Sequence, residues 1–363
     1  MAISAIDAVS PAFQHAKQQL FQPFRVGQWA KLALVGLLAG EMSSGGCNAG
    51  NFNFPKNTGG EQRFLEWMPS AAALPDINPA LYASLIALLV VLGLVLMVLF
   101  LYVSSVMRFV LFDSVLAKHC AIRRGWSLRH KPGLRLFGWQ LLLMLATMAG
   151  MIILIGIPAG IAFAAGWLDQ PHQHLIPLVL GGIALFFLVI GFVLIGLVVQ
   201  VFTKDFVVPQ MALEGIGPLE TWRRLLPMLN SEKGGYAGYI GMKVVMALGA
   251  AVVLGIVTLI VIVVLLIPFG GLGVVAILAG KAAGLGWNLY TISVAVVAGS
   301  ILLAVILYVV SLISVPAVVF FPAYSIYFFA SRYSPLGVRL NPPPAPEPSS
   351  APPPSFLPPE PAG

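Results

Sequence analysis

Charged residues are scarce in this chain. Only 9% of its 363 residues are Asp, Glu, Lys or Arg, whereas a soluble domain carries about 25%. This scarcity excludes an ordinary water-soluble globular protein. Cysteine is rarer still: Cys47 and Cys120 are the only two. The predicted membrane orientation puts them on opposite sides, so the sequence predicts no disulfide framework.

Hydrophobic residues make up 59% of the chain and gather into long uncharged runs. A membrane-spanning helix needs about 20 mostly apolar residues. The fold class predicted is therefore all-α, a polytopic transmembrane helical bundle of about six spans. Five are clear and the sixth is weaker, because its apolar core is short and lies between Lys31 and Glu41. The predicted spans are 28–46, 80–107, 136–165, 176–202, 244–267 and 287–315.

The basic residues predict the orientation. With six spans, 17 of the 20 lysines and arginines fall on one side, and only Lys56, Arg63 and Lys281 fall on the other. By the positive-inside rule, the protein is expected in the cell (inner or plasma) membrane with both termini in the cytoplasm. The net charge of +7 is then a sign of orientation and of attraction to lipid headgroups, not of nucleic-acid binding.

Several segments outside the spans carry patterns of their own. Residues 3–21 and 218–229 have helical hydrophobic spacing and predict amphipathic helices, which either lie on the inner leaflet or pack beneath the bundle. Residues 268–286 are either a re-entrant piece or the continuation of a long broken helix. We expect residues 1–340 to form a single transmembrane domain. The tail 341–363 has 11 prolines in 23 residues and predicts a disordered, proline-rich segment.

Short motifs recur along the chain and predict internal repeats. Arg25 and Trp29 match Arg135 and Trp139, and the ends of alternate spans resemble one another at 109–113, 206–210 and 319–323. These matches predict three parallel helical hairpins, with boundaries near 1–115, 116–215 and 216–335. The glycine pairs Gly36/Gly40, Gly156/Gly160 and Gly280/Gly284 predict close helix packing.

One further pattern is a resemblance. The opening stretch from Ala12 to Trp29, with Phe13, Lys17 and Gln22-Pro23-Phe24, resembles that of an uncharacterised family of bacterial and archaeal multi-pass membrane proteins. Glu41, the Phe206–Pro209 exit and Trp222-Arg223-Arg224 fit the same pattern. The arrangement is more loosely similar to the membrane domain of some glycerophosphodiester phosphodiesterases. This resemblance implies architecture only, and no residue inherits a reaction.

Candidate site residues are few, since charge is nearly missing from the span centres. Arg108 and Asp113 lie at the inner end of the second span, and Lys204 and Asp205 occupy the matching place on the fourth. These four residues are either a polar vestibule between hairpins or interfacial anchors with local ion pairs. Asp169, His172 and His174 are too few for a closed metal site, and a hydrated turn is the better interpretation. The sequence predicts no catalytic residues, no metal and no cofactor.

Two functions remain as alternatives. The first is a non-catalytic membrane scaffold or an assembly or regulatory partner, whose partners are the lipid bilayer and a protein in the membrane or at the cytoplasmic face. The second is a transporter or lipid-handling protein for a hydrophobic or amphipathic substrate, which needs no buried charge. Neither alternative is an enzyme.

Overall fold

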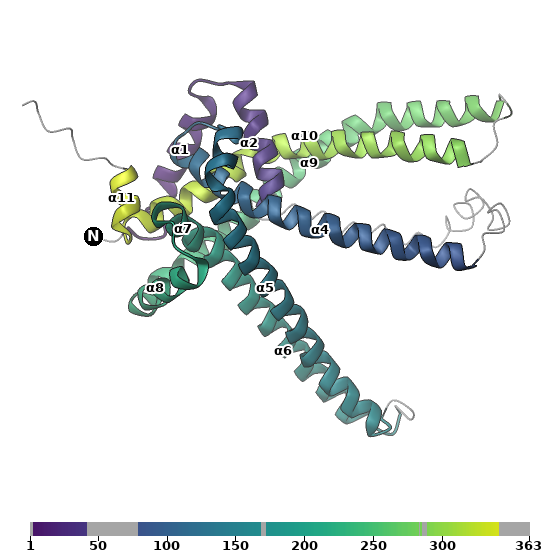
Figure 1. Cartoon of the computed structure of the whole chain (residues 1–363), viewed down its shortest axis with the longest axis horizontal. Coiled ribbons are helices and arrows are strands. Elements are labelled where there is room, and N and C mark those ends of the chain that lie inside the picture. The colour runs from purple at the N-terminus through teal and green to yellow at the C-terminus, as the bar shows by residue number, and fades with distance from the viewer. Residues whose placement is uncertain (1–2, 42–78, 168–171, 283, 285–288, 341–363) are drawn as a thin grey trace, which may run out of the picture.

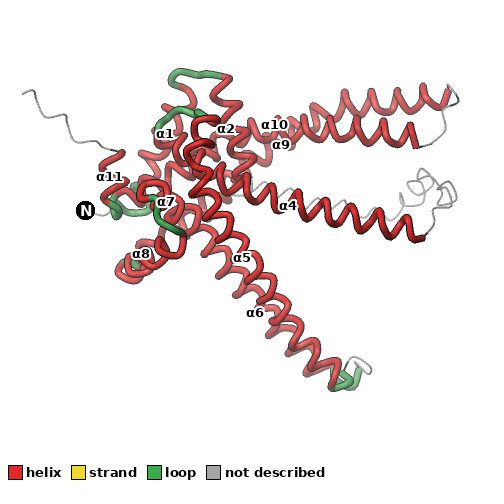
Figure 2. Tube along the Cα trace, viewed as in Figure 1, coloured by secondary structure: helices red, strands yellow, loops and turns green. Residues whose placement is uncertain are grey.

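The computed structural model describes residues 3–41, 79–167, 172–282, 284 and 289–340. All regular secondary structure in these ranges is helical (Figure 2), which confirms the all-α prediction. Five helices are long and apolar enough to cross a membrane. The five helices are α4 (Pro79–Leu116), α5 (Ile122–Ala164), α6 (Leu175–Phe202), α9 (Lys233–Ala282) and α10 (Leu289–Ala330).

The helices form a compact base from which three arms fan out (Figure 1). One arm is α4 alone, the second is the α5–α6 hairpin and the third is the α9–α10 hairpin. The base holds the inner ends of these helices together with the shorter ones. The shorter elements are α1 (Val9–Phe21), α2 (Val26–Ala39), the π-helical turn η3 (Thr203–Val207), α7 (Val208–Glu214), α8 (Pro218–Ser231) and α11 (Ser334–Leu340).

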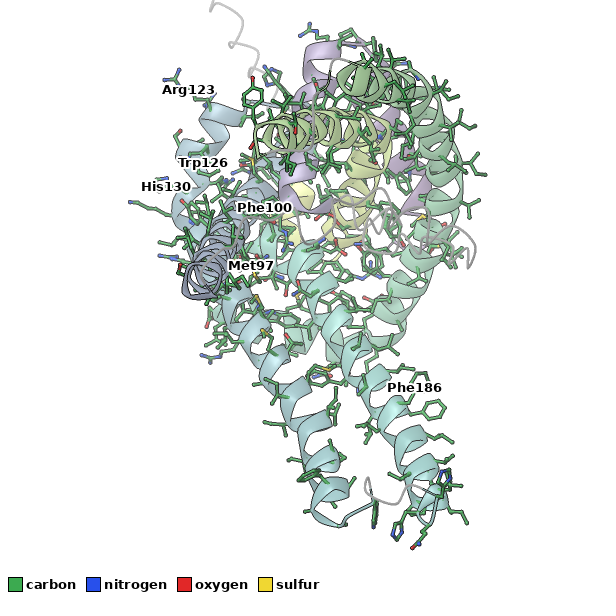
Figure 3. All side chains as sticks on the ribbon, turned by 90° about the vertical axis from the view of Figure 1, so that its right-hand side faces the viewer. Met97, Phe100, Arg123, Trp126, His130 and Phe186 are labelled. Carbon is green, nitrogen blue, oxygen red and sulfur yellow. The ribbon has the colours of Figure 1, made fainter. Side chains whose placement is uncertain are left out.

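The hydrophobic core lies in the base and not between the arms. Phe109, Phe206 and Phe328 come from three different elements of the base, and each is 0% exposed. In the arms, by contrast, Met97 and Phe186 are 46% and 60% exposed, and Phe186 points away from α5 (Figure 3). The arms therefore present apolar side chains outward, as expected of helices surrounded by lipid.

Only part of the predicted sixth span, 28–46, lies within the described residues. Its described part is α2, whose 14 residues extend about 21 Å, less than the roughly 30 Å hydrocarbon core of a bilayer. The helix ends at Gly40, which has a φ of 73° and donates its N–H to the carbonyls of Gly36 and Leu37. A left-handed residue of this kind closes a helix, and glycine adopts it without steric cost. Residues 42–46 lie outside the described ranges.

Helix α2 lies along the inner end of α4. The Gln28 side chain donates to the Lys118 carbonyl at 2.9 Å, and the Ser104 hydroxyl donates to the Ala39 carbonyl at 3.2 Å. These two contacts pair α2 with residues 104–118, at the end of α4 and just after it, and leave the outer length of α4 without α2 beside it. Glu41, which follows α2, lies in the base as well, where it lines a cavity with Arg108 and Lys204.

The structure decides between the alternatives left open for the segments outside the spans, and each described segment is a helix packed against others or the continuation of a long helix. Helix α9 continues through Pro268 to Ala282, so residues 268–282 extend a long helix and are not re-entrant. Helix α1 packs on α10, and its His15 ring contacts the Val115 carbonyl of α4 at 2.9 Å. Helix α8 contacts α5, α7 and α9. Both predicted amphipathic segments are therefore part of the base. The tail 341–363 lies outside the described residues.

Both ends of the described chain meet in the base. The backbone N–H of Ile3 donates to the Ser331 hydroxyl at 3.2 Å, and Arg332 donates to the Ile3 carbonyl at 3.0 Å. Arg332 also forms a two-bond ion pair with Glu232, at 2.6 and 2.8 Å. This contact ties the first residues to the start of α9 and the end of α10.

Only some of the glycines predicted to allow close helix packing lie at a close helix contact. A Cβ added at Gly36 would lie 2.5 Å from Val318 Cγ1, so this glycine allows α2 to approach α10 closely. Nothing lies within 4 Å of such an atom at Gly156 or Gly160. Among the predicted pairs, close packing at a glycine is therefore found in the base, where helices meet, and not along the second arm.

Candidate functional site

A small cavity lined by charged side chains lies in the base, where the end of α2 meets α4, η3, α7, α9 and α10. Its charged lining residues are Glu41 after α2, Arg108 of α4, Lys204 and Asp205 of η3, and Lys243 of α9. Helix α7 contributes Val208 and Pro209, and α10 contributes Phe321, Pro322 and Ser325. The cavity has a volume of about 30 Å³. A space of about 10–15 Å³ is enough for one water molecule, so the cavity has room for one or two particles of that size.

The local helix geometry brings Lys204 and Asp205 into this cavity together. Residues 203–207 form a π-helical turn between α6 and α7. Pro209 lacks the backbone N–H that an α-helix would donate to the Asp205 carbonyl, and its ring crowds that carbonyl. The wider turn relieves this conflict, and π-turns of this kind recur at functional sites.

Each lysine of the cavity has a carboxylate partner. Lys204 Nζ lies 3.1 Å from Glu41 Oε1. Lys243 pairs with Asp205, whose Oδ2 also accepts a hydrogen bond from the Tyr239 hydroxyl at 2.8 Å. All four charged side chains are largely removed from solvent, with Asp205 only 8% exposed. Buried charges persist when paired in this way.

Glu41 is held in its charged form. Burial by itself favours the neutral acid, but the positive charges of Lys204, Arg108 and Lys243 outweigh burial and lower the pKa of Glu41 to about 2. Glu41 is therefore a carboxylate at neutral pH, and it counts as a full negative charge in the cavity.

Arg108 is bonded differently from the lysines. Its Nε donates to the Ala39 carbonyl at the end of α2, at 3.2 Å. Its Nη1 is buried and has no hydrogen-bond partner in the described part of the chain. Arg108 therefore anchors α2 to α4 while keeping a donor unused beside the cavity.

The structure brings together three of the four residues predicted as a vestibule. Arg108, Lys204 and Asp205 line the cavity, whereas Asp113 does not. Asp113 instead accepts two hydrogen bonds from Arg129 of α5, at 2.6 and 2.8 Å. Arg129 also donates to the Ala212 carbonyl of α7, at 2.7 Å. Asp113 is thus part of a separate contact that joins α4, α5 and α7.

Sequence reasoning missed Glu41 and Lys243 as members of the cavity. The predicted span 28–46 places Glu41 near the outer side of the membrane and Lys204 near the inner side. An ion pair between these two residues was therefore not expected. Lys243 is the last charge before the uncharged run 244–280. Its position matches that of Arg108 and Lys204, which also border long uncharged runs, and this shared position is the signal that could have found it.

A second hollow lies in the base between α1, α9 and α10. It is almost wholly apolar, has a volume of about 590 Å³, and is lined by residues including Phe13, Leu20, Val253, Pro316 and Phe320. Lys17 of α1 is its charged lining residue. Its size falls within the range of about 300–1,000 Å³ that is typical of ligand pockets.

Neither the predicted turn nor the cysteines add a site in the described residues. Among these residues, no group of three or more His, Cys, Asp or Glu side chains lies close enough to hold a metal ion. His172 and His174 are described, while Asp169 is not. Cys120 is a buried free thiol, and Cys47 lies outside the described ranges.

Comparison with known proteins shows the family. The chain belongs to a family of unknown function, DUF7544, whose model matches residues 3–339. No curated protein and no solved structure matches the chain. The resemblance to an uncharacterised family is thus confirmed at that level, while the looser similarity to glycerophosphodiester phosphodiesterase membrane domains remains a prediction.

Proposed function

We propose that this protein is a non-catalytic membrane scaffold that assembles with another membrane protein through its α4 arm. The observation that carries the proposal is that the outer part of α4, residues 86–100, stands apart from the other described helices, while its inner end packs in the base (Figure 1). Every residue from 86 to 100 is exposed, including Leu89, Leu92 and Leu96 at 57%, 51% and 53%. A single helix with apolar side chains on all faces fits against lipid or against an apolar helix of another chain.

The proposed orientation has the base on the cytoplasmic side. The described chain ends meet in the base, through the contacts of Ile3 with Ser331 and Arg332. Lys281, by contrast, lies in the last turn of α9, at the tip of the third arm. This distribution of basic residues supports the positive-inside assignment, with both termini in the cytoplasm of a cell membrane.

We further propose that residues 1–340 are a single domain built from three repeated hairpins. The three similar exit segments support the repeat, because Phe109, Phe206 and Val319 are all 0% exposed and belong to one core. In this interpretation α2 with α4, α5 with α6, and α9 with α10 are equivalent pairs, and α2 is the shortened member.

Photo-crosslinking in native membranes tests the scaffold. A benzophenone amino acid at Leu96, on the α4 arm, is expected to give an adduct of one fixed mass with a second polypeptide. The matched control is the same amino acid at Phe186, which lies on the α6 arm and is 60% exposed. The control is expected to give lipid adducts and no adduct of fixed mass with a second polypeptide. If Leu96 gives lipid adducts alone, the arm has no protein partner and the scaffold proposal is wrong.

The apolar hollow supports a second candidate function, the handling of an anionic lipid. Its volume of about 590 Å³ suits an acyl chain, and Lys17 on its lining complements a negative headgroup. The hollow borders residues 316–321, just beyond the predicted span 287–315, which is the depth at which headgroups meet acyl chains. One lysine near an anionic lipid contributes about 1 kcal/mol, or roughly fivefold in binding.

A photoactivatable phosphatidylglycerol, with the reactive group on its acyl chain, tests this candidate in vesicles containing the full chain. We expect labelling of α1 and α10, and a decrease of roughly fivefold in Lys17→Gln. The matched control is Lys131→Gln, an exposed lysine on α5, which should leave the labelling unchanged. Equal labelling by the phosphatidylcholine analogue would contradict a site for anionic lipid.

A further inference from the structure

The charges that line the polar cavity do not balance among the described residues. Arg108, Lys204 and Lys243 supply three positive charges, and Glu41 and Asp205 supply two negative ones. The two lysines are paired with the two carboxylates. The surplus positive charge therefore belongs to the Arg108 guanidinium, whose bond through Nε goes to a neutral carbonyl.

Arg108 also has an unused donor at the cavity. Its Nη1 is buried without a hydrogen-bond partner in the described part of the chain, and an unpaired buried donor costs free energy, more so when it is charged. A water molecule in the cavity would accept a hydrogen bond from Nη1 but would not neutralise the surplus positive charge. An anion would accept the hydrogen bond and also neutralise the charge, and a buried cation is stable only when its charge is compensated.

We propose that the cavity binds one small monovalent anion of the size of chloride, with Arg108 Nη1 as its principal donor. The volume of about 30 Å³ restricts the site to one or two positions the size of water. The neighbouring carboxylates of Glu41 and Asp205 disfavour anions of higher charge, because each added negative charge is repelled at short range. This binding role is separate from the scaffold function.

The position of the anion gives it a structural consequence. The side chains around it come from the end of α2 and from α4, η3, α7, α9 and α10. These elements carry the inner ends of all three arms. An anion that binds only the assembled base therefore stabilises the folded protein by mass action.

The test is the thermal unfolding midpoint of the purified full chain in neutral detergent. Chloride is varied from about 1 to about 150 mM, with gluconate keeping the ionic strength constant. We expect a saturable rise of about 2–4 °C, as a ligand at several times its Kd produces. Arg108→Gln removes the charge and the forked donor, and it should abolish the rise. The control Arg123→Gln, an exposed arginine (Figure 3), should retain it.

A second variant keeps the proposal testable if Arg108→Gln does not fold. Arg108→Lys keeps the charge but loses the planar donor pair, and the half-saturating chloride concentration should rise at least about tenfold, the effect of losing roughly 1.4 kcal/mol of binding. Identical midpoints in chloride and gluconate would overturn the proposal.

Discussion

Replacing Asp205 by asparagine is expected to lower the free energy of unfolding by about 3–5 kcal/mol, because it leaves Lys243 as a buried cation without its counter-ion. The asparagine side chain keeps the volume of the aspartate and can still accept the hydrogen bond from Tyr239, so the loss reports the charge. The free energy is measured by titrating the purified chain in mixed micelles with dodecyl sulfate.

The double variant Asp205→Asn, Lys243→Met is the diagnostic control. It removes both charges of the pair, and replacing a buried ion pair by apolar groups is often neutral or stabilising. We therefore expect it to recover most of the stability lost in the single variant. Asp7→Asn, at an exposed aspartate that bonds only locally with Ser4, should change stability by less than about 0.5 kcal/mol. A double variant as unstable as the single one would show that Asp205 acts through its other contacts.

The second large effect is expected at Gly133, where α5 crosses α4. A Cβ added there would lie 2.5 Å from Val106 Cγ2 and 3.1 Å from the Val106 Cα. Because Val106 is 0% exposed and its backbone is part of a long helix, neither atom can move away easily. Gly133→Ala should therefore destabilise the chain by about 1–3 kcal/mol through overpacking.

Gly138 gives a matched comparison further along α5. Nothing lies within 4 Å of a Cβ added at this position. Alanine favours a helix over glycine by about 0.8–1.0 kcal/mol, so Gly138→Ala should leave the chain as stable as the wild type or more so. Both variants are measured by the same micelle titration. If the two substitutions shift stability in the same direction, the close approach of α5 to α4 at Gly133 is contradicted.

The cavity was only partly predictable from the sequence. Arg108, Lys204 and Asp205 are conspicuous as charges at the ends of long uncharged runs, and three of the four predicted residues do share one cavity. Asp113 was grouped with them by its position along the chain. It faces a different way from Arg108 on the same helix and pairs with Arg129 instead, a partner that chain position alone could not identify.

The sequence by itself determined the class of protein and its five long helices. Uncharged runs of more than about 20 residues have few alternatives to a helix in a membrane, since every backbone polar group must be satisfied within the segment. The sequence predicted the positions of the helix ends less well. Helices α9 and α10 extend well beyond the predicted spans into the base, because side chains packed against a protein core need not be uniformly apolar.

Only the tertiary structure decided that α2 stops short, that Glu41 meets Lys204, and that the hydrophobic core lies at one end of the molecule. Each of these results depends on contacts between residues far apart in the chain, such as Gly36 with Val318. Hydropathy reports how apolar a residue is, but in this chain both the core and the exposed surface of the arms are largely apolar. Which apolar residues form the core and which face lipid is therefore decided by how the helices pack, and this cannot be read from one segment of the sequence.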